Sequence, residues 1–433
     1  MLIPPRRLAI RRIRQHHRRI LLSLLFIFFV DIFCLIFTRP RTRRVLSPPD
    51  PWAQRLVDTN PRGNTTVFIA SVHRNTEEIL KAAWNPAIVN LIDHLGAGNV
   101  YFSAVESGSQ DRTKEALVEL KRKLDARNVP NTVSLGMTVW EQLKELDAYP
   151  DPNGERVEGW IWDNDERHYA LRRIPYLARV RNLAMEPLKA LEEQGRRYDK
   201  VLWINDVVFN TEDFLTLLHT RNGSYAAACS MDFKVYPIYY DTFALRDDLG
   251  GKAVSLYWPW FLSPTARRSA LDLEPIAVKS CWNGMVLFDS APFYANPPLR
   301  FRGIDDSLAD LHLEGSECCL IHADNFLSTR TDKGVWLNPN VRVGYDERAY
   351  RAVQGKEGRR FPGIVASVTG AWANRCLRWR SSVQQSLEQI AIASRLKQWT
   401  AATPEGEPPR AEAGEMCLIN EMQIMWQNGW KHL

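Results

Sequence analysis

Short apolar runs separated by longer polar segments recur along most of the chain. They are rich in Val, Ile, Leu and Phe, which is typical of strands buried on both faces. Because helical patterns lie between them, we predict an α/β fold with a mixed, mostly parallel sheet flanked by helices. The predicted strands are residues 66–71, 100–105, 133–135, 201–204, 225–230, 285–288 and 318–322. The predicted helices are residues 112–127, 166–193 (with a kink at Pro175) and 384–399.

The apolar run at residues 20–37 differs from the others, because it is 18 residues long and has no polar face. That length is just enough to span a bilayer, so we expect a single transmembrane helix. Asp31 disfavours insertion by about 2.5–3.5 kcal/mol, which the apolar neighbours offset. Seven arginines precede the run and four follow it closely, which favours a cytoplasmic N-terminus. A cleaved signal peptide and a buried helix are the alternatives, and no small-residue cleavage site follows the run.

The composition of the chain does not alter these predictions. The chain is 45% hydrophobic and 24% charged, as globular proteins are. Its formal charge of +6 is smaller than the contribution of the seven arginines among the first 19 residues, so nothing indicates nucleic-acid binding. The predicted parts are a basic cytoplasmic tail (1–19), a signal anchor (20–37), a stem (38–62), an α/β domain (63–345) and a C-terminal extension packed on that domain (346–433).

Six cysteines follow the predicted anchor, and six allow fifteen pairings, so the disulfide connectivity stays open. No spacing of cysteine and histidine is typical of zinc. The tripeptides that begin at Asn64 and Asn222 are predicted N-glycosylation sites. The six cysteines are Cys229, Cys281, Cys318, Cys319, Cys376 and Cys417.

Asn205 and Asp206 directly follow the buried strand at residues 201–204. In an open α/β sheet, ligands bind at the carboxyl ends of the strands. A carboxylate there can hold Mn²⁺ or Mg²⁺ against a phosphate group, so both residues are candidate metal ligands and Asp206 a candidate catalytic residue. Alternatively, the pair simply caps the turn that follows.

A polar loop follows the strand at residues 100–105 and precedes a helix. Its Ser and Gly residues would let backbone N–H groups face an anion, and Asp111 could contact a ribose or a base. Glu106, Ser107 and Asp111 are therefore candidate nucleotide-sugar ligands. The competing interpretation is an ordinary loop in which Asp111 caps the helix.

Three further segments carry candidate chemistry. His322 lies at the carboxyl end of the strand predicted at 318–322 and is a second candidate metal ligand, although a structural histidine is the commoner case. In the acidic run that begins at Asp305, the residues Asp306, Asp310, Glu314 and Glu317 are spaced by three or four and would share one side of a helix. Asp305, Asp306 and Glu317 are candidate catalytic or acceptor-binding residues, with a solvated helix face as the alternative. Arg246 and Asp247 could lie near the phosphates or the sugar, and Trp282 could stack on a sugar, although most large aromatic residues pack in cores.

Seven short segments, taken in order, resemble the fungal family of Golgi mannosyltransferases and capsule-associated proteins, glycosyltransferase family 69. They are Phe68-Ile-Ala, Tyr101-Phe-Ser-x-Val-Glu-Ser-Gly-Ser-x-Asp111, Ile174-Pro-Tyr-Leu-Ala-x-x-Arg-Asn182, Val201-Leu-x-Ile-Asn-Asp-Val-Val-Phe209, Tyr240-Asp-Thr-Phe-x-x-Arg-Asp247, Cys281-Trp-Asn-Gly284 and Ser316-Glu-Cys-Cys-Leu-Ile-His-Ala-Asp324.

The resemblance implies a GT-A-like nucleotide-sugar fold, Golgi membrane anchoring with a luminal catalytic domain, and transfer of α-mannose from GDP-mannose to a glycan in α-1,3 linkage with retention. It assigns Arg181 and Asn283, which lie in the matched segments, to the donor site. It also implies Mn²⁺ or Mg²⁺, usually held by Asp-x-Asp; this chain has Ile204-Asn205-Asp206 instead. A Golgi glycosyltransferase complex is an expected partner. A non-catalytic glycan-binding protein and a UDP-sugar transferase stay as alternatives.

Overall fold

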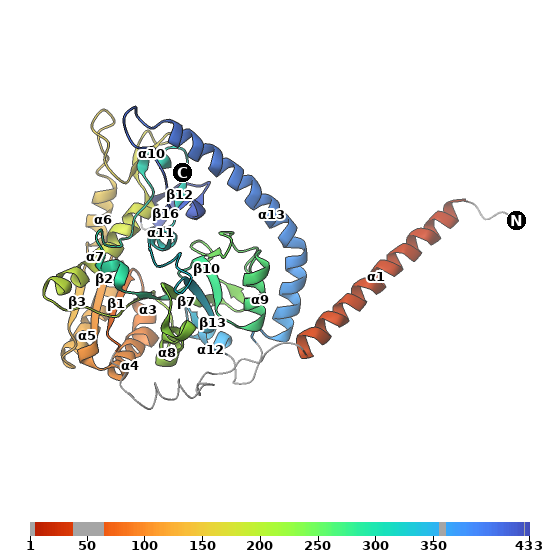
Figure 1. Cartoon of the computed structure of the whole chain (residues 1–433), viewed down its shortest axis with the longest axis horizontal. Coiled ribbons are helices and arrows are strands. Elements are labelled where there is room, and N and C mark those ends of the chain that lie inside the picture. Colours follow the sequence, from red (N-terminus) through yellow and green to blue (C-terminus); the bar gives the residue numbers. More distant parts are fainter. Residues whose placement is uncertain (1–4, 38–64, 355–360, 428) are drawn as a thin grey trace.

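A single ten-stranded sheet forms the centre of the protein in the computed structural model (Figure 1). The structure describes residues 5–37, 65–354, 361–427 and 429–433. The strand order is β3-β2-β1-β6-β11-β7-β13-β10-β9, and β8 pairs with β7. Strands β3, β2, β1, β6, β7 and β13 run in one direction, whereas β11 and β10 run against their neighbours. The mixed, mostly parallel sheet predicted from the sequence is therefore confirmed.

The strands of this sheet are β1 (Val67–His73), β2 (Val100–Glu106), β3 (Asn131–Leu135), β6 (Lys200–Ile204), β7 (Ala227–Val235), β8 (Ile238–Tyr239), β9 (Arg246–Asp247), β10 (Ile276–Ser280), β11 (Met285–Asp289) and β13 (Val335–Gly344). Small sheets pair β4 (Trp160–Asp163) with β5 (His168–Leu171), β12 (Glu314–Gly315) with β14 (Leu418–Ile419), and β15 (Gln423–Trp426) with β16 (Gly429–His432). The longer helices are α1 (Pro5–Phe37), α4 (Asn85–Leu95), α5 (Thr113–Asp125), α6 (Val139–Leu146), α7 (Arg173–Glu193), α8 (Thr211–Leu218), α9 (Pro264–Asp272), α11 (Glu317–Ala323), α12 (Glu347–Gln354) and α13 (Ile364–Ala401).

Two hydrophobic cores cover the two faces of the sheet. Successive residues of β1 alternate between them: Phe68 belongs to the core that contains side chains of α7, and Ile69 to the core under α4, α5 and α8. All seven residues of β1 are buried or nearly so, which explains why the strands read as unbroken apolar runs. The parallel strands thus end at one edge, framed by helices on both faces.

Several elements differ from the sequence prediction. Residues 318–322, predicted as a strand, lie in helix α11, whose first turn is capped by Ser316 accepting a hydrogen bond from Cys318 N. Helix α7 begins at Arg173, so Pro175 lies in its first turn, where proline is tolerated, and causes no kink. The acidic run from Asp305 onward is divided between α10 (Asp306–Ala309), β12 and α11, so it does not form one helix face.

Two disulfides resolve the open pairing of the cysteines. Cys229 of β7 bonds to Cys281, and Cys319 of α11 bonds to Cys417. The second bond ties the C-terminal segment to the body of the protein across 98 residues of sequence. Arg246 strengthens the same junction, because its guanidinium donates to the carbonyl oxygens of Met416 (2.7 Å) and Cys417 (3.1 Å).

The N-terminal segment forms one continuous helix, α1, which contains both the arginine-rich residues and the apolar run that follows them. It contacts α13, where the Arg375 guanidinium pairs with the Asp31 carboxylate at 2.6 Å. Figure 1 shows α13 running along one side of the molecule and α1 projecting from its end. Within the described residues no helix is both long enough and apolar enough to cross a membrane. The predicted anchor is therefore wrong, and so is the single-pass type II Golgi localisation inferred from it.

The remaining predictions for this part of the chain concern the stem and the glycosylation sites. The stem at 38–62 and Asn64 lie outside the described residues. Asn222 is exposed in a turn with φ of 59°.

Candidate functional site

The carboxyl ends of the central strands meet the start of β11 at one edge of the sheet. Asn205 and Asp206 follow β6, and Asn205 N donates to Gly284 O at 2.8 Å. Two residues further, Val208 N donates to Gly344 O at the end of β13, at 2.7 Å. The predicted metal-binding pair is thus held between the start of β11 and the end of β13.

A tight turn before β11 brings an indole to Asn205. Asn283 and Gly284 both have positive φ, 52° and 82°, a combination typical of Asn-Gly turns. A Cβ on Gly284 would lie 2.7 Å from Val343 Cγ2, so only glycine fits there. The turn places Trp282 so that its Nε1 donates to Asn205 Oδ1 at 3.0 Å. The amide oxygen that would serve a cation is therefore already engaged.

Asp206 directly follows Asn205 and is half-buried. Burial raises the pKa of its carboxyl to about 6, and the charge of Lys234 only partly opposes this shift. A half-buried carboxylate with so little positive charge nearby favours the approach of a cation.

Two more carboxyl groups lie close to this pair. Asp232 of β7 accepts hydrogen bonds from Tyr345 Oη (3.1 Å), Asn283 Nδ2 (3.3 Å) and Asp241 N (3.1 Å). Burial and the neighbouring Asp241 carboxylate raise the pKa of Asp232 to about 7.

Tyr345 follows β13 and lies close enough to these carboxyl groups and to Asp206 to interact electrostatically with all three. Burial raises the pKa of its hydroxyl well above the usual value, and nearby carboxylates add to the shift. Those carboxylates belong to Asp232, Asp241 and Asp206.

An ion pair borders the acidic cluster on its other side. Arg181 Nε of α7 donates to Glu317 Oε1 of α11 at 3.0 Å. The guanidinium also lies over the Trp282 ring at 4.5 Å from its centroid. Because Trp282 is only 2% exposed and packs against Trp203 and Phe301, it has no open face for a sugar. Its indole N–H is used by the hydrogen bond to Asn205.

This arrangement fits a hard divalent cation held by one carboxylate together with phosphate and water oxygens. Within the described residues, the three-residue group at metal-binding spacing is Cys229, Cys281 and His322, and its two sulfurs form a disulfide. No all-protein cage of three carboxylates is present in that part of the chain. Mg²⁺ and related ions usually bind nucleotide sites through one or two carboxylates plus substrate phosphates, as Asp206 would allow.

His322 lies in α11 and not at the end of a strand. Its Nε2 must donate, because its partner at 2.6 Å is the carbonyl oxygen of Cys281. The ring stacks on Phe288, and burial lowers the pKa of the imidazole to about 4. In this structure His322 holds the loop that carries Trp282, and its Nε2 is not offered to a cation.

The loop after β2 is built mainly from its own hydrogen bonds. Glu106 is buried and accepts from Ser109 N at 2.5 Å, while Lys114 Nζ lies 3.3 Å from its other oxygen. Ser107 Oγ lies 2.9 Å from Tyr176 Oη. Asp111 accepts from Glu77 N and Thr113 N at 3.0 Å and so ties the start of α5 to residue 77, while Arg112 is the N-cap residue of that helix.

Four other predicted residues have structural partners. Arg246 binds backbone carbonyls, as described above, and Asp247 accepts from Gly251 N and Ser263 N. Asp305 caps α10. Asp306 pairs with buried Arg172 at 2.6 Å and accepts from Gly159 N at 2.9 Å. The contacts of these residues hold loops and helices together.

The sequence interpretation missed Asp232, Asp241 and Tyr345. Asp232 lies inside a strand of otherwise buried residues, where an ionisable group is rare. Extending the predicted strand beyond residue 230 would have exposed this anomaly. Asp241 and Tyr345 carry no such signal, because they reach the site only through the pairing of β7 with β8 and β13.

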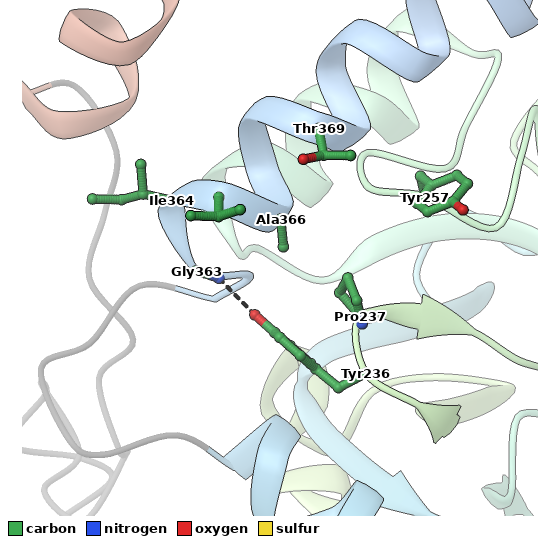
Figure 2. A pocket seen from close by; sticks show the side chains of 8 residues that line it. Tyr236, Pro237, Tyr257, Gly363, Ile364, Ala366 and Thr369 are labelled. Carbon is green, nitrogen blue, oxygen red and sulfur yellow. Dashed lines mark hydrogen bonds between the residues drawn. The ribbon is translucent and has the colours of Figure 1, made fainter.

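A pocket lies away from this cluster. Figure 2 shows a pocket of about 490 Å³ at the N-terminal end of α13, where Gly363 N donates to Tyr236 Oη at 2.8 Å. None of its lining residues is charged, so it offers no anchor for a diphosphate. They are Tyr236, Pro237, Tyr257, Gly363, Ile364, Val365, Ala366 and Thr369.

Comparison with known protein families matches residues 66–324 to cryptococcal mannosyltransferase 1, which is more than half of the chain. The chain belongs to this family. Membership in the cryptococcal mannosyltransferase 1 family confirms the resemblance found in the sequence and supports a role in glycosyl transfer. The matched segment contains Asn205, Asp206, Asp232, Arg181 and Glu317. No curated protein matches the chain.

Solved structures show weaker similarity to this member of the cryptococcal mannosyltransferase 1 family. Mannosyltransferase PcManGT from Pyrobaculum calidifontis, in complex with GDP-Man and Mn²⁺, is 11% identical with a TM-score of 0.37, over 88% of this chain and 86% of that one. GalNAc-T7 with UDP, GalNAc and Mn²⁺ is 11% identical with a TM-score of 0.35, over 70% and 56%. S. aureus TarS 1–349 is 11% identical with a TM-score of 0.33, over 65% and 60%. The chain thus spans less than two thirds of that TarS fragment.

Proposed function

We propose that this protein transfers mannose from GDP-mannose to a hydroxyl group of a glycan, in α-1,3 linkage and with retention at the anomeric carbon. Family membership supports glycosyl transfer. The observation that carries the site assignment is the position of Asp206. It follows β6 at the carboxyl edge of the sheet, half-buried, with Asp232 and Asp241 near the same tyrosine.

The donor would lie along this edge with its diphosphate at Asp206. A bound Mn²⁺ or Mg²⁺ would neutralise charge on the leaving diphosphate. Asp206 would hold that ion, and the amide of Asn205 would act indirectly, because Trp282 Nε1 already occupies its oxygen.

The remaining side chains of the cluster would position the sugars. Asp241 and Glu317 are acceptors suited to sugar hydroxyl groups. The ion pair with Arg181 fixes Glu317 in place. Asp232, held by Tyr345 and Asn283, would support the floor of the site.

The reaction then needs no protein nucleophile. The bond between the anomeric carbon and the diphosphate breaks, and the acceptor oxygen bonds to that carbon on the same face. The acceptor proton passes to the leaving phosphate oxygen, which gives GDP and the mannosylated product. Protein groups act by holding donor and acceptor in contact.

One observation favours a second candidate, a non-catalytic glycan-binding member of the family. Asn205 is neutral and engaged with Trp282, so the cation site has a single protein carboxylate directly at hand. A protein that has lost metal affinity would keep the fold and the acidic cluster and still bind sugar hydroxyls. Transfer of another sugar from a UDP donor is the remaining alternative.

A donor screen tests the proposal. Purified full-length protein is incubated with GDP-mannose, other GDP-sugars and UDP-sugars, using mannosides as acceptors, with Mn²⁺, with Mg²⁺ or with EDTA. We expect release of GDP and a mannosylated product that depends on metal, with the linkage determined by NMR. Absence of turnover with every donor and metal would rule out the catalytic proposal and leave the binding alternative.

A further inference from the structure

Arg74 leaves the sheet at the same edge as Asp206. Strands β1 and β6 are parallel neighbours, with Ala70 opposite Trp203. Arg74 follows β1 directly, and Asp206 lies two residues beyond the end of β6. The two side chains therefore start from adjacent strand ends.

Arg74 lacks a counter-charge among the residues that the structure describes. Its Nε and Nη2 atoms are buried and have no hydrogen-bond partner, and no carboxylate among the described residues lies within ion-pairing distance of it. In contrast, Arg172 and Arg181 each pair with a buried glutamate. Guanidinium groups stay charged in proteins. An unpaired buried charge is unfavourable unless a ligand supplies the anion.

The backbone around Arg74 is fixed relative to Asn205. The buried ring of His73 packs edge-on against Trp84 with ring centroids 4.5 Å apart. The same indole donates from Nε1 to Asn205 O at 2.9 Å. On the other side, Asn75 Oδ1 accepts from Gln110 N at 2.7 Å, which ties the segment to the loop after β2. These contacts hold the turn that carries Arg74 in place, as a preformed ligand site requires.

We propose that Arg74 binds the diphosphate of the nucleotide-sugar donor. This inference rests on the proposed function and names a phosphate-binding residue for the same site. Guanidinium groups match phosphate oxygens in geometry and charge. Because Asn205 is neutral, the protein offers the cation one carboxylate here instead of the two of an Asp-x-Asp motif. Arg74 adds positive charge on the opposite side of the diphosphate.

The test compares Arg74→Gln with wild type and with Arg127→Gln. Arg127 is an exposed arginine that pairs with Asp93 near the start of β3, at the opposite edge of the sheet. Binding of GDP, UDP, guanosine and uridine is measured by calorimetry with Mg²⁺ present, and thermal unfolding is followed without ligand.

We expect Arg74→Gln to weaken binding of the nucleoside diphosphate about 10- to 100-fold and to leave nucleoside binding unchanged. Arg127→Gln should behave as wild type. Because the described residues give the buried Arg74 nitrogens no hydrogen-bond partner to lose, Arg74→Gln should unfold at the same temperature as wild type or a higher one. Retained diphosphate affinity in Arg74→Gln would overturn the inference and leave the proposed function intact. A lower unfolding temperature together with weaker binding of nucleosides would also overturn it, by showing a structural role. If wild type binds no nucleoside diphosphate, the proposed function itself fails.

Discussion

Arg181 donates from Nε to Glu317 Oε1 across 3.0 Å, and this ion pair joins α7 to α11 beside the acidic cluster. Both side chains are largely shielded from solvent. Glu317 therefore has two tasks, because it neutralises a buried guanidinium and lines the proposed sugar site.

The first prediction concerns this pair. Glu317→Gln leaves the Arg181 charge buried without compensation, so we expect a loss of about 3–5 kcal/mol in the free energy of unfolding. Arg179, also in α7, forms a more exposed pair with Glu145 of α6, and Glu145→Gln should cost less than about 1 kcal/mol. Urea unfolding of both variants measures the difference. Equal losses of unfolding free energy in the two variants would contradict the larger contribution to stability expected of the Arg181–Glu317 pair.

The second prediction concerns the neutral residue of the Asn205-Asp206 pair. In Asn205→Asp the indole N–H of Trp282 can still donate to a side-chain oxygen, while the second carboxylate oxygen becomes available to a cation. We expect Mn²⁺ affinity to rise about tenfold or more. A metal titration followed by calorimetry checks this, with Asp305→Asn as a control far from the cation. Unchanged affinity would mean that Asn205 does not border the cation.

The third prediction uses His322. Burial lowers the pKa of its imidazole from the usual value of 6.5 to about 4. Between these values the unfolded chain binds a proton that the folded protein excludes, so stability is fully present above pH 6.5 and is lost as the pH falls towards 4. The total effect is about 3 kcal/mol. His322→Gln keeps a donor for Cys281 O and removes the titrating group, so its unfolding temperature should depend less on pH in this window. An unchanged slope between pH 4 and 6.5 would contradict the assignment.

The fourth prediction separates structure from catalysis at Asp306. Arg172 is completely buried and pairs with Asp306 at 2.6 Å and with Glu314 at 2.7 Å. Asp306→Asn should lower the free energy of unfolding by about 1–3 kcal/mol and leave kcat of the folded enzyme unchanged. Denaturant unfolding and steady-state kinetics on the same preparation give both values. A large fall in kcat with unchanged stability would restore the catalytic role predicted from the sequence.

The sheet and the position of Asn205 and Asp206 could be predicted because each depends on residues that are close together in the sequence. An apolar run that ends in two polar residues needs only the strand period and the rule for strand ends. The partners of that pair could not be predicted in the same way. Trp282 reaches Asn205 through a turn with two positive φ angles, and Tyr345 reaches Asp232 through the pairing of β7 with β13. These contacts join residues more than 70 positions apart.

The errors have equally local causes. Residues 318–322 are apolar enough for a strand but are capped as a helix by Ser316. Asp305, Asp306, Asp247 and Arg246 are polar residues in plausible places, yet backbone groups and partner side chains already use them. A sequence shows that a polar residue is present, and only the fold shows whether its bonds are already made.

Asp206 is proposed to hold the cation used in sugar transfer, and the variant Asp206→Asn tests this role. Because burial raises the pKa of this carboxyl to about 6, the neutral amide should not destabilise the fold. Transfer of sugar from the best donor in the screen is measured with saturating Mn²⁺, alongside Asp305→Asn. We predict a loss of at least about 100-fold for Asp206→Asn, with an unfolding temperature no lower than wild type and full activity in the control. Transfer by Asp206→Asn at the wild-type rate would show that the Asp206 carboxylate is not needed for the reaction.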